Sequence, residues 1–264
     1  QALDISPMYR TLGRPLGSQW RGSGTIKLRA NDGREGSRYR QANDWSSKFD
    51  NSAEFIRNSV APFRLVMRMT PQVEDRFGAE FYRRHYFDRR TRVVTRADMA
   101  RRADLVAAFA RHGELQVRSI LDVGCGLGLM RRQLLRSFPR ARYTGLEFSE
   151  YLCRRYGWEQ GSAADFDPGR TYDLVVCYDV LQYLDARAAA AAIRNLGHLC
   201  AGVLHFGVLT QEDWDLNCNQ STTDRNVHMR PGAWYRRRLA PDFINAGSGM
   251  FVRRGAPIHL WELD

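Results

Sequence analysis

The chain has 264 residues, of which 44% are hydrophobic and 26% are charged, and its formal net charge is +11. This length and apolar content suffice for one α/β domain with a substantial core plus an accessory region. No apolar run approaches the roughly 18 to 20 residues that span a bilayer, so the composition argues against a membrane-spanning protein and predicts no membrane partner.

The N-terminal segment, residues 1–60, is rich in Gly, Ser and Arg and shows no persistent helical or strand period. It is predicted to be a basic, irregular extension, because too few apolar residues recur to form a core. Residues 1–118 contain 23 Lys and Arg against 13 Asp and Glu, whereas residues 119–264 contain 17 against 16. Such asymmetry is typical of a surface for nucleic acid or an acidic substrate, or of a GC-rich gene that encodes few lysines.

Residues 61–115 are predicted to form a helical cap. Thr95 and Asp98 have the spacing of a capping box, and apolar residues follow at intervals of three and four, namely Met99, Ala103, Val106 and Ala110. Just before this helix, in the stretch FYRRHYFDRR, aromatic residues that include Tyr82 and Tyr86 alternate with arginines. This alternation fits a core-packing face, a lid over a ligand, or a surface that grips RNA.

From residue 116 to 264 short apolar strands alternate with helical segments, which predicts a parallel sheet covered by helices. The predicted strands are Ser119–Val123, Tyr143–Glu147, Leu174–Cys177 and Val203–Phe206. The predicted helices cover residues 128–137, 149–156 and 186–199. At the end of the chain, Met250–Arg253 and Ile258–Glu262 are predicted to pair as an antiparallel hairpin around the turn RGAP.

The five cysteines are scattered without a C-x-x-C pair. An odd, dispersed set in a chain with a good core favours reduced thiols, which predicts a cytoplasmic location and no metal site. Residue 1 is Gln rather than Met, so the sequence leaves open whether a targeting segment was removed.

The most informative stretch is ILDVGCGLGLM, residues 120–130, where a predicted strand runs into a glycine-rich turn. Glycines at such a turn let backbone amides approach a ligand and start a helix that faces it. Asp122 disfavours a pyrophosphate at this place and suits a cationic ligand. Glu147 ends the next predicted strand, where a carboxylate can accept both hydroxyls of a ribose. A small cation and a ribose together describe S-adenosylmethionine better than NAD.

These residues resemble the class I S-adenosylmethionine-dependent methyltransferases. ILDVGCGLG is similar to their first motif, Glu147 to the ribose acid, QGSAADF (160–166) to the loop around adenine, and YDLVVCYDVLQYLD (172–185) to the fourth-strand motif. The resemblance implies a Rossmann-like, seven-stranded, mostly parallel sheet with a C-terminal antiparallel hairpin and a lid-like insertion around residues 210–240.

The resemblance also implies the roles of single residues. The methionine part of the cofactor would be held by Asp122, Gly124, Cys125 and Gly126, and the ribose by Glu147. Ser162 and Ala163 would border the adenine; many members carry Asp where this chain has Ser162, which brings in Asp165 as an alternative contact. Cys177 and Tyr178 would line the side of the sulfonium, although Cys177 also fits a packing role inside its strand.

The acceptor is harder to predict because methyl transfer needs positioning, exclusion of water and at most one proton transfer. CYDVLQYL lacks the turns used for nucleobase methylation and resembles the small-molecule enzymes of the family. The candidate catalytic residues are His205, His228 and Tyr86, each of which also fits a structural role. A small-molecule methyltransferase acting on an O or N atom is therefore the main hypothesis.

Two alternatives stay open at this point. The basic N-terminal region would let a methyltransferase hold RNA or a ribonucleoprotein, and a protein without activity would keep the cofactor fold as a binding scaffold. The sequence gives no indication of the oligomeric state.

Overall fold

The computed structural model describes residues 76–260. The predicted N-terminal extension at 1–60 and the first part of the predicted cap at 61–115 therefore lie outside the described residues. None of the helices within residues 76–260 is long and apolar enough to cross a membrane.

Within the described residues, seven strands form one sheet in the order β3-β2-β1-β4-β5-β7-β6. Strands β1 to β5 pair in parallel, whereas β7 is antiparallel to both β5 and β6. The strands are β1 (Ser119–Val123), β2 (Arg142–Glu147), β3 (Glu159–Gln160), β4 (Tyr172–Tyr178), β5 (Cys200–Gly207), β6 (Phe243–Asn245) and β7 (Met250–Arg253). The expected Rossmann-like sheet, mostly parallel with an antiparallel C-terminal hairpin, is confirmed.

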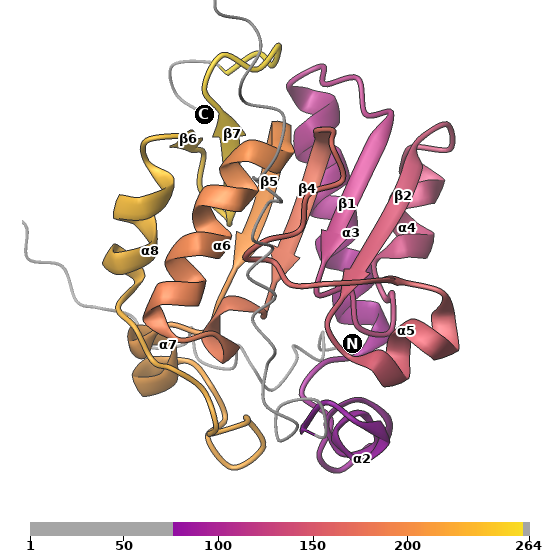
Figure 1. Ribbon diagram of the computed structural model, residues 1–264, viewed down its shortest axis with the longest axis vertical. Helices are drawn as coiled ribbons and strands as arrows, with labels where there is room; N and C mark the ends of the chain where they lie inside the picture. Colours follow the sequence, from indigo (N-terminus) through magenta and orange to yellow (C-terminus); the bar gives the residue numbers. More distant parts are fainter. Residues whose placement is uncertain (1–75, 261–264) are drawn as a thin grey trace, which may run out of the picture. The chain divides into compact units, whose positions relative to one another are not determined.

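Helices cover both faces of this sheet (Figure 1). One face is packed by α3 (Arg96–His112) and α4 (Arg131–Ser137), and the other by α6 (Ala186–Leu199) and α8 (Gly232–Leu239). The shorter elements are α2 (Ala79–Tyr82), the π-helical turn η2 (Arg83–Phe87), α5 (Glu150–Tyr156), the 3₁₀ turn η3 (Leu181–Tyr183) and α7 (Gln211–Leu216). Both α2 and α7 lie at the end of the sheet to which the parallel strands point (Figure 1).

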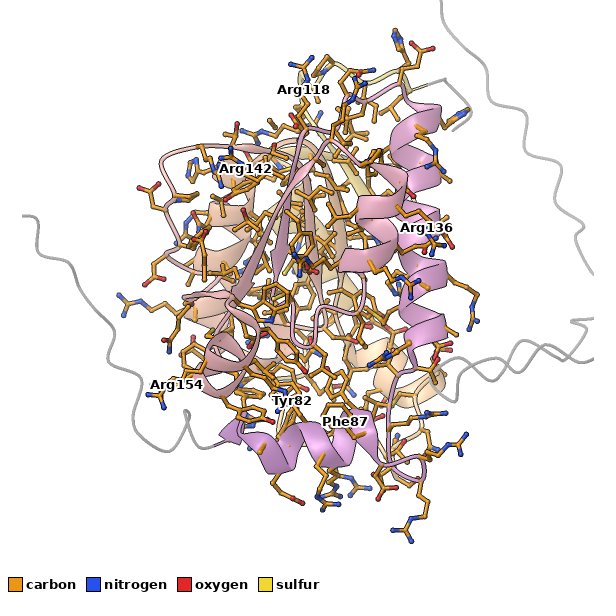
Figure 2. All side chains as sticks on the ribbon, turned by 90° about the vertical axis from the view of Figure 1, so that its right-hand side faces the viewer. Tyr82, Phe87, Arg118, Arg136, Arg142 and Arg154 are labelled. Carbon is orange, nitrogen blue, oxygen red and sulfur yellow. The ribbon has the colours of Figure 1, made fainter. Side chains whose placement is uncertain are left out.

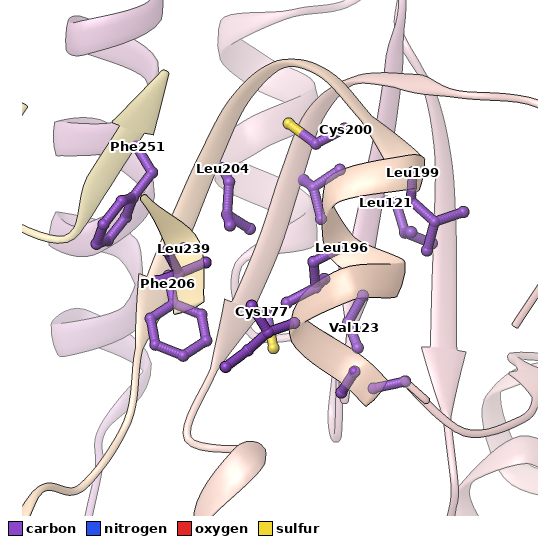
Figure 3. Close-up of a cluster of buried hydrophobic side chains, with 14 of the residues drawn as sticks. Leu121, Val123, Cys177, Leu196, Leu199, Cys200, Leu204, Phe206, Leu239 and Phe251 are labelled. Atoms are coloured by element: carbon purple, nitrogen blue, oxygen red, sulfur yellow. The ribbon is translucent and has the colours of Figure 1, made fainter. Parts of the chain in front are cut away.

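The central strands are apolar on both faces because both are covered. In β4, Leu174 and Val176 pack with α3 and α4, while Val175 and Cys177 pack on the opposite side. Figure 3 shows the hydrophobic cluster on the α6 face of the sheet, in which Cys177 lies among side chains of α6 and the neighbouring strands. These four side chains are all fully buried, so the register of β4 is firmly set.

The predicted capping box of α3 is present. The backbone N–H of Asp98 donates to Oγ1 of Thr95 at 3.1 Å, and the backbone N–H of Thr95 donates to Oδ2 of Asp98 at 2.9 Å. Two amides of the first turn are thereby satisfied, and the helix begins at Arg96. The α6 helix also has the predicted bounds, and the Asp185 side chain caps it.

The predicted C-terminal hairpin is wrong in its partners. Met250–Arg253 pairs with Phe243–Asn245, and residues 258–260, the described part of the predicted partner, form no strand. The turn consists of Gly247, Ser248 and Gly249, which all have positive φ and therefore reverse the chain tightly. After β7 the chain instead returns to the end of α3, where the backbone N–H of His259 donates to the carbonyl oxygen of Gly113 at 3.1 Å.

Replacing a glycine in the turn after β1 tests how tightly the side chains pack at the carboxyl ends of the strands. Gly124 and Gly157 have similar positive φ values, +65° and +70°. A Cβ at Gly124 would lie 2.3 Å from Cγ2 of Val180, whereas a Cβ at Gly157 would meet no atom within 4 Å. We expect Gly157→Ala to cost about 1 kcal/mol of unfolding free energy, and Gly124→Ala roughly 1 to 3 kcal/mol more, because a β-branched side chain has few rotamers into which it can retreat. Chemical denaturation of both variants measures the difference, and equal losses would contradict the packing argument.

Candidate functional site

The glycine-rich turn leaves the carboxyl end of β1 and meets the end of β2. The backbone N–H groups of Gly124 and Cys125 both donate to the carbonyl oxygen of Leu146, at 2.8 and 3.2 Å. A Cβ at Gly126 would meet nothing closer than 3.9 Å, so this glycine borders open space. The turn therefore exposes backbone at Gly126 while its other residues are packed.

Trp158, which the sequence analysis did not identify, packs against this turn and donates a hydrogen bond to it. Its indole Nε1–H donates to the carbonyl oxygen of Gly126 at 2.9 Å. A Cβ at Gly128 would lie 2.8 Å from the same indole ring, and a Cβ at Gly145 2.7 Å from it. The ring thus requires glycine at both positions, and no spacing rule in the sequence links Trp158 to the turn.

Glu147, the predicted ribose acid, lies directly against the glycine turn. Its Oε2 accepts the backbone N–H of Gly126 at 2.7 Å, and its Oε1 accepts those of Phe148 and Ser149, both at 2.9 Å. The side chain is 6% exposed. Burial raises the pKa of Glu147 although three amides stabilise its ionised form. The structure therefore places a desolvated carboxylate beside the exposed backbone of the turn.

Asp122 points from β1 toward β2, where the hydroxyl of Tyr143 donates to its Oδ2 at 2.5 Å. The carboxylate is 5% exposed, and burial raises its pKa to about 7. The hydrogen bond from Tyr143 lowers the pKa and the nearby charge of Glu147 raises it, both to a smaller extent than burial. A cation close to Asp122 would relieve this penalty, which fits the predicted contact with an ammonium group.

The loop after β3 carries the residues predicted to border the adenine. The backbone N–H of Gly161 donates to the carbonyl oxygen of Glu147 at 3.0 Å, which fixes the loop beside β2. Asn195 of α6 donates from Nδ2 to the carbonyl oxygens of Ala163 and Phe166, at 3.1 and 2.9 Å. The side chain of Ser162 is half-buried, whereas that of Asp165 is exposed to solvent. Both assignments stay predictions.

The cap packs against the same end of the sheet. Oγ of Ser149 donates to the carbonyl oxygen of Phe77 at 2.6 Å, which ties the cap to the start of α5. Tyr82 is 4% exposed and lies on the side of the cap that faces the sheet (Figure 2). Burial, and then the charges of Asp179 and Glu147, raise the pKa of Tyr86. Its phenol is therefore close to the carboxyl ends of both β2 and β4.

The residues predicted near the sulfonium turn out to face different ways. Cys177 is fully buried in the core against α6, so its thiol packs among apolar side chains and does not line the cavity beside β4. The Cys125 side chain is likewise buried and packs toward Gly145. Tyr178 packs toward the other face of the sheet, where its ring lies parallel to His205 and 3.7 Å below the Arg102 guanidinium. Tyr178 lines that cavity and not the glycine turn.

This cavity has a volume of about 610 Å³ and lies at the carboxyl ends of β4 and β5. His205, one of the predicted catalytic residues, forms part of its wall and is 1% exposed. Burial, and then the charge of Arg102, lower its pKa to about 3. A neutral imidazole with so low a pKa is a poor proton acceptor, which argues against His205 as the general base.

His228, the other predicted histidine, lies elsewhere. It is exposed, and its backbone N–H donates to the carbonyl oxygen of Gln182 at 2.7 Å. The structure thus brings Asp122, Gly126 and Glu147 together and places Tyr86 near them, while His205 and His228 lie apart. Arg102, which no motif indicated, lines the same cavity as His205. So does Asp179, which belongs to the fourth-strand motif but had no predicted role. No group of three His, Cys, Asp or Glu residues within residues 76–260 has the arrangement of a metal site.

Comparison with known proteins agrees with this geometry. Residues 121–202 match the family described as "Methyltransferase domain". A dTDP-3-amino-3,6-dideoxy-alpha-D-glucopyranose N,N-dimethyltransferase of Streptomyces fradiae is 29% identical over 154 residues, covering 55% of this chain and 51% of the relative. A malonyl-[acyl-carrier protein] O-methyltransferase of Halalkalibacterium halodurans is 28% identical over 106 residues, covering 35% and 39%.

Among solved structures, the sugar N-methyltransferase KedS8 from a Streptoalloteichus species is 30% identical, with a TM-score of 0.37, covering 40% of this chain and 47% of that one. The chain spans about half the length, or less, of the curated relatives described above. The expected resemblance to methyltransferases is confirmed for residues 121–202, which contain the glycine turn, Glu147 and the fourth strand.

The buried carboxylate of Asp122 predicts how stability depends on pH. Its folded pKa of about 7 lies above the ordinary value of 3.8, so the folded state binds this proton more tightly and loses stability as the pH rises from about 4 to 7. Asn keeps the acceptor for Tyr143 but does not ionise. We expect Asp122→Asn to gain about 1 to 3 kcal/mol relative to the parent protein between pH 4 and pH 8. Denaturation without ligand at several pH values measures this, with Asp167→Asn at an exposed turn as the control. If the difference in unfolding free energy between Asp122→Asn and the parent protein stays constant or shrinks as the pH rises, the burial argument is refuted.

Proposed function

We propose that this chain, whose residues 121–202 carry a methyltransferase domain, transfers a methyl group from S-adenosylmethionine to a small-molecule acceptor. One observation carries the proposal most directly: the glycine turn and Glu147 meet at the carboxyl ends of two adjacent parallel strands inside the matched segment. Ligands of such sheets bind outside the carboxyl ends of the strands.

The residues at these strand ends fit the cofactor in charge and shape. The open backbone at Gly126, with Asp122 nearby, suits the amino-acid part, and the buried carboxylate of Glu147 suits hydroxyl donors such as those of a ribose. The loop at 161–165 would border the base. When bound, the cofactor supplies an electrophilic methyl carbon.

The cap and the cavity supply what the acceptor needs. Tyr82 and Tyr86 close the site from the cap, and a dry site favours displacement because water cannot compete for the methyl group. The 610 Å³ cavity at the ends of β4 and β5 is large enough for a small organic molecule. One relative acts on an amino sugar nitrogen and the other on a carrier-bound malonyl group, which supports a small acceptor with an N or O atom.

We place residues 116–264 in the catalytic domain, residues 61–115 in its cap, and residues 210–240 in a lid-like insertion. A reducing, cytoplasmic setting is part of the proposal, because all five cysteines are free and four are buried. The RNA-binding alternative rests on the excess of basic residues in 1–118, of which residues 1–75 lie outside the described part of the chain. The proposal therefore does not include it.

The proposal is tested by calorimetry with S-adenosylmethionine and S-adenosylhomocysteine. We expect Glu147→Ala to weaken binding by about 10- to 100-fold, because a charge-assisted hydrogen bond contributes about 1.5 to 3 kcal/mol. Glu147→Gln should also weaken binding, since only one of its terminal atoms can accept. Glu150→Gln, at an exposed position on α5, is the matched control and should bind normally.

Two outcomes of this experiment would count against the proposal. Unchanged affinity in both Glu147 variants would remove the ribose role of this residue. Absence of binding to the parent protein, shown by mass spectrometry to carry no co-purified ligand, would contradict the methyltransferase function itself.

A further inference from the structure

The cavity beside β4 has a polar wall that the proposed cofactor site does not use. Its lining includes Arg102, Asp179, His205 and Asp213, but neither Glu147 nor any residue of the glycine turn. Asp179 directly follows β4, so it stands at the boundary between this cavity and the strand ends where the cofactor would bind.

Asp179 is held in a costly backbone conformation. Its φ is +59°, in the left-handed region that residues with a Cβ seldom adopt. The conformation persists because the backbone N–H of Asp179 donates to the carbonyl oxygen of Gly207 at 2.9 Å, on the neighbouring strand β5. Strain of this kind at the wall of a cavity points to a functional carboxylate.

The carboxylate of Asp179 has no ion-pair partner within 4.0 Å among residues 76–260. It receives a hydrogen bond from the Gln182 side chain, and Arg102 lies close enough to act on its charge. Arg102 itself lies over the Tyr178 ring at 3.7 Å. A negative group that is desolvated and only partly compensated favours a ligand that brings a cationic or N–H group.

Polar atoms around Asp179 also lack partners. Oε1 of Gln182 is buried without a donor, and neither ring nitrogen of His205 has a well-aligned hydrogen bond, although the backbone of Gly249 lies near enough to raise the pKa of this histidine. Leaving such atoms unpaired costs free energy, so a ligand that satisfies them gains affinity. Of these two side chains only His205 lines the cavity, and a neutral imidazole offers one donor and one acceptor, which is the complement of a hydroxyl group.

From this arrangement we propose that Asp179 is a catalytic base for an amine acceptor, and that His205 binds a hydroxyl group of the same molecule. The acceptor class is thus a hydroxylated primary or secondary amine. This inference rests on the proposed methyl transfer and specifies the acceptor for it.

The step balances in atoms and charge. The nitrogen lone pair of the amine forms the new N–C bond, the C–S bond of the sulfonium breaks, and sulfur keeps that electron pair. As the N–C bond forms, the nitrogen becomes cationic and passes one proton to the Asp179 carboxylate in the same transition state. The products are the methylated neutral amine, S-adenosylhomocysteine and a protonated Asp179, which returns its proton to solvent.

The electrostatic surroundings agree with this role. Burial raises the pKa of Asp179 to about 6, against the lowering effects of Arg102 and of the Gln182 hydrogen bond, and Asp213 raises it slightly further. The titratable and charged groups that face Asp179 are Arg102 from α3, Asp213 from α7, Tyr86 from the cap, Tyr183 from η3 and Cys177 from β4. Asp179 is therefore ionised at neutral pH but a stronger base than an exposed aspartate.

The decisive variant is Asp179→Asn, which tolerates a positive φ and keeps the shape of the side chain. Asp185→Asn is the matched control, because Asp185 is an exposed helix N-cap where Asn caps equally well. Calorimetry with S-adenosylmethionine comes first, and both variants should bind as the parent does. Failure of all three to bind would refute the proposed function rather than the role of Asp179.

Acceptor chemistry is then tested with three matched probes, D-glucosamine, D-glucose and D-glucuronate. With S-adenosylhomocysteine bound, we expect D-glucosamine to raise the thermal midpoint of the parent and of Asp185→Asn more than the other two do, and this preference to vanish in Asp179→Asn. With methyl-labelled S-adenosylmethionine, label transfer to D-glucosamine should fall by about 10²- to 10⁴-fold in Asp179→Asn. No preference for the amine in the parent, or equal transfer by the variant, overturns the inference.

A pH profile separates a base from a merely structural residue. Reaction through a neutral amine and an ionised Asp179 makes the logarithm of kcat/KM fall with a slope of one below the amine pKa. Below about pH 6 the slope should steepen to two in the parent, because Asp179 becomes protonated. The residual activity of Asp179→Asn should keep a slope of one throughout. If the slope in this variant also steepens to two near pH 6, the assignment is overturned.

Discussion

The hydrogen bond from the Gly126 amide to the Glu147 carboxylate is the interaction on which the site depends. At 2.7 Å it joins the turn after β1 to the end of β2, and the amides of Phe148 and Ser149 hold the same carboxylate from the other side. Both groups can meet only because the two strands are adjacent and parallel, with Val123 opposite Leu146. The sheet order therefore comes first and the site follows from it.

Burial of carboxylates is the recurring cost of this arrangement. Asp122, Glu147 and Asp179 each have a raised pKa, and in each case loss of solvent is the largest cause. A fold that needed only stability would gain by replacing them with neutral side chains, since an uncompensated buried charge is unfavourable. Their clustering at the carboxyl ends of β1, β2 and β4 instead indicates ligands that bring positive charge or hydrogen-bond donors.

Local signals in the sequence predicted much of the fold, because they depend on neighbours in the chain. The capping box of Thr95 and Asp98, the bounds of α6 and the central strands all reflect periodicity and end signals over a few residues. The hairpin was mispredicted because β6 has only three residues and two of them are exposed, so it carries no alternation of its own. Trp158 and Arg102 were not predicted for a different reason. Each contacts a residue more than 30 positions away in the sequence, Gly126 and Tyr178 respectively, and only the folded sheet brings the two members of each pair together.

The three residues at the end of β4, Cys177 to Asp179, have side chains that point in different directions, so they do not line the same site. Alternation along the strand directs Cys177 to the α6 core and Tyr178 to the opposite face, so a continued strand would direct the next side chain back toward the α6 core. A carboxylate there would be enclosed by apolar groups. The positive φ of Asp179 ends the alternation and leads the chain into η3, which leaves the carboxylate at the wall of the cavity instead. Glycine would adopt this conformation at lower cost but would place no carboxylate at the cavity wall, and Asp is one of the few residues with a Cβ that enter this region readily.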